Sequence, residues 1–283
     1  LCLPREEFDE KRVADSIKEL QREFSGNSFH LHTYMGVYEI RDRDEAVSIM
    51  VDKANIAADT IKNNYDCCVA YYDEHLLEIS IEQRRLLGEF EPALQNDEFV
   101  MYLQPQVKRD GAAKGAEALV RWVHPSRGIL TPYAFIDILE NAGLIYKLDL
   151  YIWEKAAQKL AEWKEKGYGS YHISVNISTK DFYIIDIYET FTGLINKYGI
   201  AASNLHLEIT ETTLMTDFEK NMNIIHMLQG VGFRVEIDDF GSGYSSLNML
   251  KDISADVLKI DMGFLRKSEN EVKGQDILES IIT

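Results

Sequence analysis

The sequence predicts an α/β fold in which most of the chain forms a TIM-like barrel. Beyond Asn96, short apolar segments typical of strands alternate with amphipathic segments typical of helices, which indicates a largely parallel sheet. The number of these units, together with the lack of a dinucleotide-binding glycine fingerprint, favours a barrel over a Rossmann sheet. The 283 residues, 46% hydrophobic and 27% charged, suffice for one large domain, or for a large and a small one.

The first part of the chain shows a different order of elements. Apolar side chains at helical spacing predict helices over 5–25 and 43–64, and a charged helix is expected over 74–95. The strands expected between them are 28–40, with a bulge at Gly36, and 69–72. His30 and His32 share one face of the first strand, as half of a metal site or as a solvated strand face.

The second part carries the expected barrel. Its predicted strands are 99–106, 115–123, 172–177, 205–210, 234–239 and 257–261. Its predicted helices lie near 132–142, 148–166, 181–198, 217–230, 244–252 and 275–282. Because active sites of parallel barrels lie at the carboxyl ends of the strands, polar residues there are the functional candidates.

Charge and composition exclude several classes of protein. A net charge of −17 argues against a surface for nucleic-acid polymers, although a metal ion could still bring a nucleotide substrate to the chain. Cys2, Cys67 and Cys68 lack metal-ligand spacing and read as reduced thiols of an intracellular protein. We find no signal peptide and no apolar run of the ~18 residues that a membrane span needs. A start at Leu1 rather than Met fits a fragment.

Oxygen ligands occur on four of the expected strands, and their side chains would converge at one barrel mouth. They form a hard-oxygen set suited to Mg²⁺ or Mn²⁺ rather than zinc: Glu117, Asn176, Glu208 and Asp238. Asp239 could bridge to a second ion, and two such ions can activate a water for phosphodiester hydrolysis. The alternative for any single residue is a helix N-cap or a salt-bridge partner.

Two further features stand near these strand ends. Lys259 shares a face with Asp261, where its amine could hold an attacking water or neutralise a phosphate. Residues 240–247 are small and polar and precede a predicted helix, which suits anion binding. A plain turn capped by Ser245 or Ser246 explains them equally well.

Residues 99–283 resemble the EAL-domain family of cyclic di-GMP phosphodiesterases. The motifs that carry the resemblance are Tyr102-Leu103-Gln104-Pro105, Glu117-Ala118-Leu119-Val120-Arg121-Trp122, Phe135-Ile136 with Glu140, Asn176-Ile177-Ser178, Glu208-Ile209-Thr210-Glu211, Asp238 to Leu247, and Lys259-Ile260-Asp261. The resemblance implies a (β/α)₈ barrel with an antiparallel first strand. It also implies hydrolysis of cyclic di-GMP to linear pGpG with Mg²⁺ or Mn²⁺.

The resemblance also implies roles for individual residues. The implied metal ligands are Glu117, Asn176, Glu208 and Asp238, with Asp239 on a second metal. The implied catalytic residues are Glu117, Asp238 and Lys259, the last assisting the attacking water. Gln104 and Arg121 resemble substrate contacts. Glu211 resembles the anchor of the 240–247 loop, which in the family couples a dimer interface to the metal site.

The domain organisation expected from these resemblances has three parts. Met35-Gly36-Val37, Asp52 to Ala57, Lys62-Asn63-Asn64 and Tyr71-Tyr72-Asp73 occur in the order found in a GGDEF domain, so residues 1–78 resemble the second half of a small α+β GGDEF-like domain. Residues 79–98 are expected to form a linker helix, and 99–283 the EAL domain. The diguanylate-cyclase signature would precede Leu1, so no cyclase activity is expected. A homodimer through the EAL domain and a cytoplasmic location are also expected, with an upstream membrane anchor left open.

Two departures from the family pattern bear on activity. The family continues with a strand that bears a further catalytic Glu and an eighth strand with a substrate-binding Gln, whereas this sequence stops at Thr283. Six strands cannot close a barrel of eight, so a truncated form and a poor catalyst are expected. Glu236 replaces a small residue and would need a partner such as Lys259. An inactive cyclic di-GMP receptor or a dimerisation scaffold is the alternative function.

Overall fold

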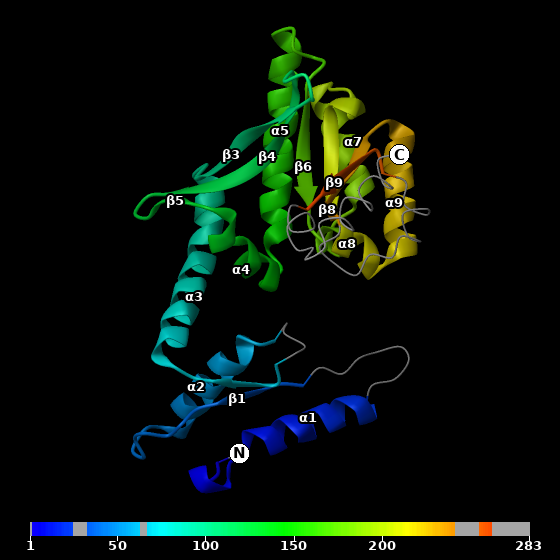
Figure 1. Cartoon of the computed structure of the whole chain (residues 1–283). Helices are drawn as coiled ribbons and strands as arrows, with labels where there is room; N and C mark the ends of the chain where they lie inside the picture. The colour runs from blue at the N-terminus through cyan, green and yellow to red at the C-terminus, as the bar shows by residue number, and fades with distance from the viewer. Residues whose placement is uncertain (1, 25–32, 63–66, 241–254, 262–283) are drawn as a thin grey trace. The chain divides into compact units, whose positions relative to one another are not determined.

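The structure is a computed structural model that describes residues 2–24, 33–62, 67–240 and 255–261. The chain divides into two compact units, Leu1–Gly88 and Glu89–Thr283. Helix α3 (Glu74–Gln95) runs across this division (Figure 1). None of the helices in the described ranges combines the length and the apolar character that a membrane span requires.

A parallel pair of short strands organises the first unit. Its elements are η1 (Arg5–Glu7), α1 (Glu10–Phe24), β1 (Met35–Val37), α2 (Val47–Asp59) and β2 (Val69–Tyr71). β1 and β2 are parallel, and α2 forms the crossover between them. Ile17 of α1 packs against Cys68 and Val69. Helix α2 packs tightly on β1 at Gly36, because a Cβ there would lie 1.7 Å from the Ala54 carbonyl oxygen.

The first unit is less regular than its sequence suggests. Of the strand expected over 28–40, the described residues retain the three of β1, and the helix expected over 43–64 is confined to α2. Gly36 pairs in regular register with Ala70, so the bulge expected there is absent. His30 and His32 lie outside the described residues, and so do the helices expected at 244–252 and 275–282.

A seven-stranded mixed sheet forms the centre of the second unit. Its strands are β3 (Phe99–Val107), β4 (Ala113–His124), β5 (Gly128–Leu130), β6 (His172–Ile177), β7 (Leu205–Thr210), β8 (Arg234–Phe240) and β9 (Val257–Ile260). The order is β3-β4-β6-β7-β8-β9, with β5 paired to β4. β3 is antiparallel to β4, as the resemblance implied, and the strands from β4 through β9 along this path are parallel. Within the described residues the sheet stays open, as expected for six strands of a barrel of eight.

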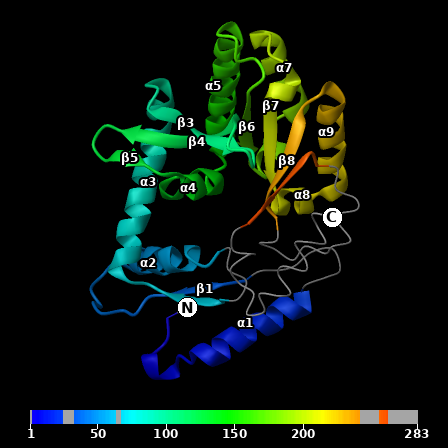
Figure 2. The same ribbon diagram turned by 45° about the horizontal axis from the view of Figure 1, so that its top comes forward.

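Eight helical segments follow α3 in the described part of the second unit, and the longer ones pack along one face of the sheet. They are η2 (Pro132–Ala134), α4 (Ile136–Asn141), α5 (Ile145–Glu165), α6 (Asp181–Ile184), α7 (Ile187–Tyr198), η3 (Ala202–Asn204), α8 (Glu211–Thr216) and α9 (Phe218–Val231). Helices α5, α7 and α9 lie side by side along β6, β7 and β8 (Figures 1 and 2). The ring centroids of Trp153 in α5 and Phe191 in α7 are 4.5 Å apart, and Trp153 is fully buried.

The helix expected over 181–198 is divided into α6 and α7. Ile185 has extended backbone angles that end the first helix. Asp186 then begins the second, because its side chain accepts a hydrogen bond from the Glu189 backbone N–H. The short helix α8 was not predicted and lies directly after β7, where it places Glu211 at the end of that strand.

Candidate metal centre at the carboxyl ends of the strands

The sheet register places the predicted ligands within three successive levels of one face. Asn176 on β6 pairs with Glu208 on β7, and Glu117 on β4 pairs with Ser174, one pleat below Asn176. Asp238 on β8 pairs with Thr210, one pleat above Glu208. Because side chains alternate along a strand, these residues project from the same face of the sheet. The Asn176 side-chain amide donates to Glu117 Oε1 at 3.4 Å.

Lys259 on β9 connects to carboxylates on β4 and β7. Its Nζ donates to Glu117 Oε2 at 3.1 Å and makes a short hydrogen bond with Glu208 Oε1. Four strand-to-strand steps separate β4 from β9, which would be about 19 Å in a flat sheet. The contact between Lys259 and Glu117 therefore requires a strongly curved sheet, which brings distant strands around a common centre.

Glu208 is the most deeply buried member of the cluster, with 1% of its surface exposed. Its Oε2 has no hydrogen-bond partner among the described residues. Burial raises the pKa of Glu208 to about 8, with further contributions from the charges of Glu117 and Asp238, although Lys259 opposes the shift. A buried, unsatisfied carboxylate oxygen beside two other acidic groups fits a divalent cation.

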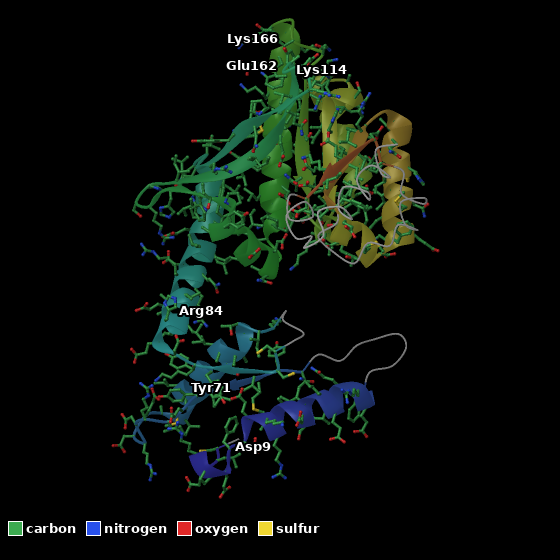
Figure 3. All side chains as sticks on the ribbon, in the orientation of Figure 1. Asp9, Tyr71, Arg84, Lys114, Glu162 and Lys166 are labelled. Atoms are coloured by element: carbon green, nitrogen blue, oxygen red, sulfur yellow. The ribbon has the colours of Figure 1, made fainter. Side chains whose placement is uncertain are left out.

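A surface glutamate shows how much burial matters here. Glu162 near the end of α5 (Figure 3) also has lysine partners, at 2.6 Å from Lys159 and 2.5 Å from Lys166. Its hydrogen bonds to these lysines lower its pKa to about 2. The pKa of Glu208 moves the other way because loss of solvent outweighs its lysine partner.

Asp239 departs from the alternation of its strand. Its φ is 54°, in the left-handed region, and the register between β8 and β9 shifts between Ile237 and Phe240. Burial and the neighbouring Asp238 and Asp261 carboxylates raise the pKa of Asp239. The irregular backbone thus turns Asp239 away from its regular strand position and keeps it within the electrostatic reach of the cluster.

The remaining predicted residues lie around this centre. Gln104 on β3 is directly opposite Glu117 and exposed. Arg121 lies further along β4, where its guanidinium is 5.6 Å from the Tyr102 ring centroid and donates to the Val120 carbonyl at 2.8 Å. Among the described residues Arg121 forms no ion pair with the carboxylates.

Glu211 is buried as the first residue of α8. It follows Thr210, whose side chain caps the helix by accepting from the Thr213 backbone N–H. The loop that Glu211 is expected to anchor lies outside the described residues beyond Phe240.

A second polar layer, which the sequence analysis did not identify as a site, lies on the same face, and its members on β6, β7 and β8 each precede the predicted ligand of their own strand. It contains Gln106, His172, Ser174, His206 and Glu236. Only Glu236 was noted beforehand, and its Oε2 is indeed 3.8 Å from the Lys259 Nζ. The alternation of side chains along a strand could have placed the two histidines on this face, because each precedes a predicted ligand of its own strand by an even number of residues.

Comparison with known proteins places this architecture in a family. The EAL domain model matches residues 88–283. A diguanylate cyclase/cyclic di-GMP phosphodiesterase from Pseudomonas aeruginosa, MucR, is 32% identical over 227 residues, which is 80% of this chain and 33% of MucR. The cyclic di-GMP phosphodiesterase PdeR of Escherichia coli is 31% identical over 190 residues, 67% of this chain and 29% of PdeR.

A solved structure shows the same relationship. The PaMucR phosphodiesterase in complex with cyclic di-GMP matches with a TM-score of 0.65 and 33% identity, over 70% of this chain and 81% of that one. The chain spans about a third of the length of the curated relatives it matches.

Proposed function

Because the chain belongs to the EAL domain family, we propose that it carries a metal-dependent phosphodiesterase domain that hydrolyses cyclic di-GMP to linear pGpG. The curated relatives MucR and PdeR have cyclic di-GMP phosphodiesterase activity in their names, and the PaMucR structure contains cyclic di-GMP. The observation that carries the proposal is Glu208, buried with an unsatisfied oxygen beside Glu117 and Lys259.

We propose that Mg²⁺ or Mn²⁺ is held by the strand-end oxygen ligands Glu117, Asn176, Glu208 and Asp238. Asp239 is proposed to bind a second ion. Such ions polarise a phosphoryl oxygen and lower the pKa of a bound water. The donor set fits them because it contains oxygen atoms alone, which hard cations prefer. Asn176 adds a neutral ligand to the carboxylates, which moderates their mutual repulsion.

Lys259 has the role of a positioning and charge-balancing group in this proposal. Its ammonium holds Glu117 and Glu208 together across the curved sheet. Burial lowers the pKa of Lys259, but the hydrogen bond to Glu208 and the charges of Glu208, Glu117 and Asp238 together outweigh burial and raise the pKa, so the amine stays protonated at neutral pH. A protonated amine at this point can orient an attacking water or stabilise negative charge on a phosphate.

The proposed substrate contacts lie on the antiparallel strands β3 and β4. Gln104 faces Glu117 across the β3–β4 pair and is exposed to solvent, which makes its amide available to a ligand. We propose that Arg121 contacts a phosphate or guanine after leaving the Tyr102 ring. Glu211 is proposed to anchor the loop that follows β8.

We also propose a domain organisation for the whole chain. Residues 1–78 would derive from a GGDEF-like domain, with 79–98 as a linker helix and 99–283 as the EAL domain. The proposed first part is a small α+β unit, and the β1–β2 pair with helices α1 and α2 supports a mixed composition of helices and strands there. We further propose a homodimer formed through the EAL domain and a cytoplasmic location, and light scattering on the chain tests the dimer.

The test is incubation of the purified chain with cyclic di-GMP in Mg²⁺ or Mn²⁺, with parallel calorimetric titration of the same ligand. Linear pGpG should form with either metal and should be absent with a chelator. Binding without product under both metals would support the receptor alternative. A chain that neither binds nor hydrolyses cyclic di-GMP would contradict both functions.

A further inference from the structure

Glu236 is a buried carboxylate to which the proposed reaction gives no role. It lies on β8, two residues before Asp238 and on the same face of the sheet, and it is 2% exposed. His206 Nδ1 on the adjacent strand β7 is 2.6 Å from Glu236 Oε1. Burial raises the pKa of Glu236, but the hydrogen bond from His206 and the charge of Lys259 contribute to a lower net pKa, so the carboxylate is ionised. Its other oxygen, Oε2, has no hydrogen-bond partner among the described residues.

The imidazole that holds Glu236 is itself fixed in place. The His206 ring stacks on that of His172, with centroids 3.8 Å apart and planes 3° apart. Gln106 Oε1 lies 2.8 Å from His172 Nε2, so a hydrogen bond fixes the second ring. The neighbouring Gly115 leaves room for that ring, since a Cβ there would lie 2.2 Å from Nε2. The orientation of Glu236 is therefore supported by side chains of β3, β6 and β7.

The open oxygen of Glu236 faces the ammonium of Lys259. An ammonium has three N–H donors, and two of those on Lys259 serve Glu117, at 3.1 Å, and Glu208. Glu236 Oε2 lies 3.8 Å from the same Nζ, beyond hydrogen-bond distance but close enough for an ion pair. A movement of about 1 Å by the flexible lysine chain would give a charge-assisted hydrogen bond. A donor on β9 and an acceptor on β8 thus stand ready for each other.

Lys259 and a cation at the strand ends need the same oxygen atoms. The two carboxylates that hold the ammonium, Glu117 and Glu208, are also proposed metal ligands. Positive charges at such short range repel each other, so the ammonium needs another counter-ion when a metal ion binds. Glu236 is outside the proposed ligand set, is ionised, and has one oxygen open toward the amine. It meets the three conditions for that counter-ion.

We propose that Glu236 is a positioning residue for Lys259, which receives the ammonium when Glu117 and Glu208 turn to a metal ion. The inference rests on the proposed function, since it presumes a divalent cation at those two carboxylates. With Glu236 as its partner, the amine stays charged beside the site, where it can orient a water or a phosphate. Lys259 and the cation can then occupy one interior together instead of excluding each other.

The experiment measures Mn²⁺ affinity by electron paramagnetic resonance across a double-mutant cycle of Glu236→Gln and Lys259→Met. Glu236→Gln should weaken Mn²⁺ binding about tenfold, because an ammonium without its alternative partner competes for Glu117 and Glu208. Lys259→Met should bind Mn²⁺ more tightly than the original chain, because the competitor is gone. In the Lys259→Met background, Glu236→Gln should change Mn²⁺ affinity by less than about twofold.

Turnover of cyclic di-GMP at saturating Mn²⁺ gives a second readout. Glu236→Gln should lower kcat with little change in KM, and the double variant should be no slower than Lys259→Met alone. Glu89→Gln is the matched control, since Glu89 also pairs with a histidine, His124 at 2.9 Å, and it should leave Mn²⁺ affinity and turnover unchanged. Circular dichroism establishes folding. Where Glu236→Gln does not fold, His206→Phe removes the Nδ1 donor, keeps a stacking ring and should weaken Mn²⁺ binding in the same way.

Two results would overturn the inference and leave the proposed function standing. The first is equal weakening of Mn²⁺ binding by Glu236→Gln with and without Lys259, because Glu236 would then act on the ion through its charge alone. The second is unchanged Mn²⁺ affinity in Glu236→Gln while the original chain binds the ion. An original chain that binds no Mn²⁺ would contradict the proposed metal centre itself, and the inference would fall with it.

Discussion

Two polar layers lie on one face of the same curved sheet, and they differ in chemistry. The upper layer holds carboxylates and Asn176 around Lys259, and the lower layer pairs the stacked rings of His172 and His206 with Glu236. One pleat separates them along β7, where His206 precedes Glu208 by two residues. Successive side chains on one face of a parallel sheet can therefore gather carboxylates and imidazoles into separate groups within a single interior.

The largest expected effect lies in the upper layer. Glu117→Ala should reduce cyclic di-GMP hydrolysis by about a thousandfold, because loss of a ligand removes several kcal/mol of metal-ion stabilisation. Initial rates of pGpG formation measure the effect. Glu162→Gln on the surface of α5 (Figure 3) is the matched control and should keep the original rate. Unchanged turnover in Glu117→Ala would remove that residue from the site.

Lys259→Ala should be the next largest change, measured on the metal-free chain by denaturant unfolding. The loss in free energy of unfolding should stay below the ~3–5 kcal/mol of a fully buried ion pair, because the Lys259 side chain is 23% exposed and Glu208, with a pKa of about 8, is mostly protonated at neutral pH. Mg²⁺ should stabilise this variant more than the original chain. The matched control, Lys155→Ala, removes an exposed pair with Asp97 and should change stability far less.

The pH dependence of Mg²⁺ binding should also distinguish the layers. Glu208, with a pKa of about 8, must lose its proton to bind a metal, so Mg²⁺ affinity should rise about tenfold per unit from pH 6 and level off above 8. His172, with a pKa of about 4, stays neutral throughout this range.

Loss of the Glu208 proton, which favours Mg²⁺ binding, should lower the stability of the metal-free chain. A carboxyl pKa raised by folding stabilises the protein fully below the unfolded value of 4.5, and this contribution is lost as pH rises through about 8. The metal-free chain should therefore lose stability over that window, and Mg²⁺ should restore it. Glu208→Gln should remove both trends, and a pH slope that persists in it would contradict the assignment.

The smallest effect is expected from a methyl group in the lower layer. Gly115→Ala should lower the free energy of unfolding by about 1–3 kcal/mol, because the new Cβ meets the His172 ring held by Gln106. Gly193→Ala in α7 meets nothing within 4 Å and should stabilise by about 0.5–1 kcal/mol through helix propensity. Equal effects would show that the His172 ring is free to move. Thermal unfolding of both variants gives the comparison.

The convergence of Glu117, Asn176, Glu208 and Lys259 was expected from the sequence, and that of the lower layer was not. Carboxylates at strand ends are informative because chain position alone assigns them to one edge of a parallel sheet. His172 and His206 stand at the beginnings of strands, and their partners are dozens of residues away in the chain. Only the register between strands shows that these side chains meet.

Local backbone features were also beyond the sequence pattern. The apolar spacing over 181–198 predicted one continuous helix and gave no sign of the extended backbone at Ile185. The alternation of residues in the strand likewise did not predict the left-handed backbone conformation of Asp239. Arg121 lies over the Tyr102 ring, a contact that depends on the β3–β4 pairing and that the local sequence does not indicate. Each of these depends on tertiary neighbours rather than on local propensity.

The most direct test of a divalent-metal centre at the strand ends is an anomalous diffraction map of the chain crystallised with Mn²⁺. The account predicts a manganese peak within ligand distance of Glu117, Asn176 and Glu208, with Lys259 displaced from at least one carboxylate. A chain that binds no Mn²⁺ there, or binds it only among His172, His206 and Glu236, would contradict the account.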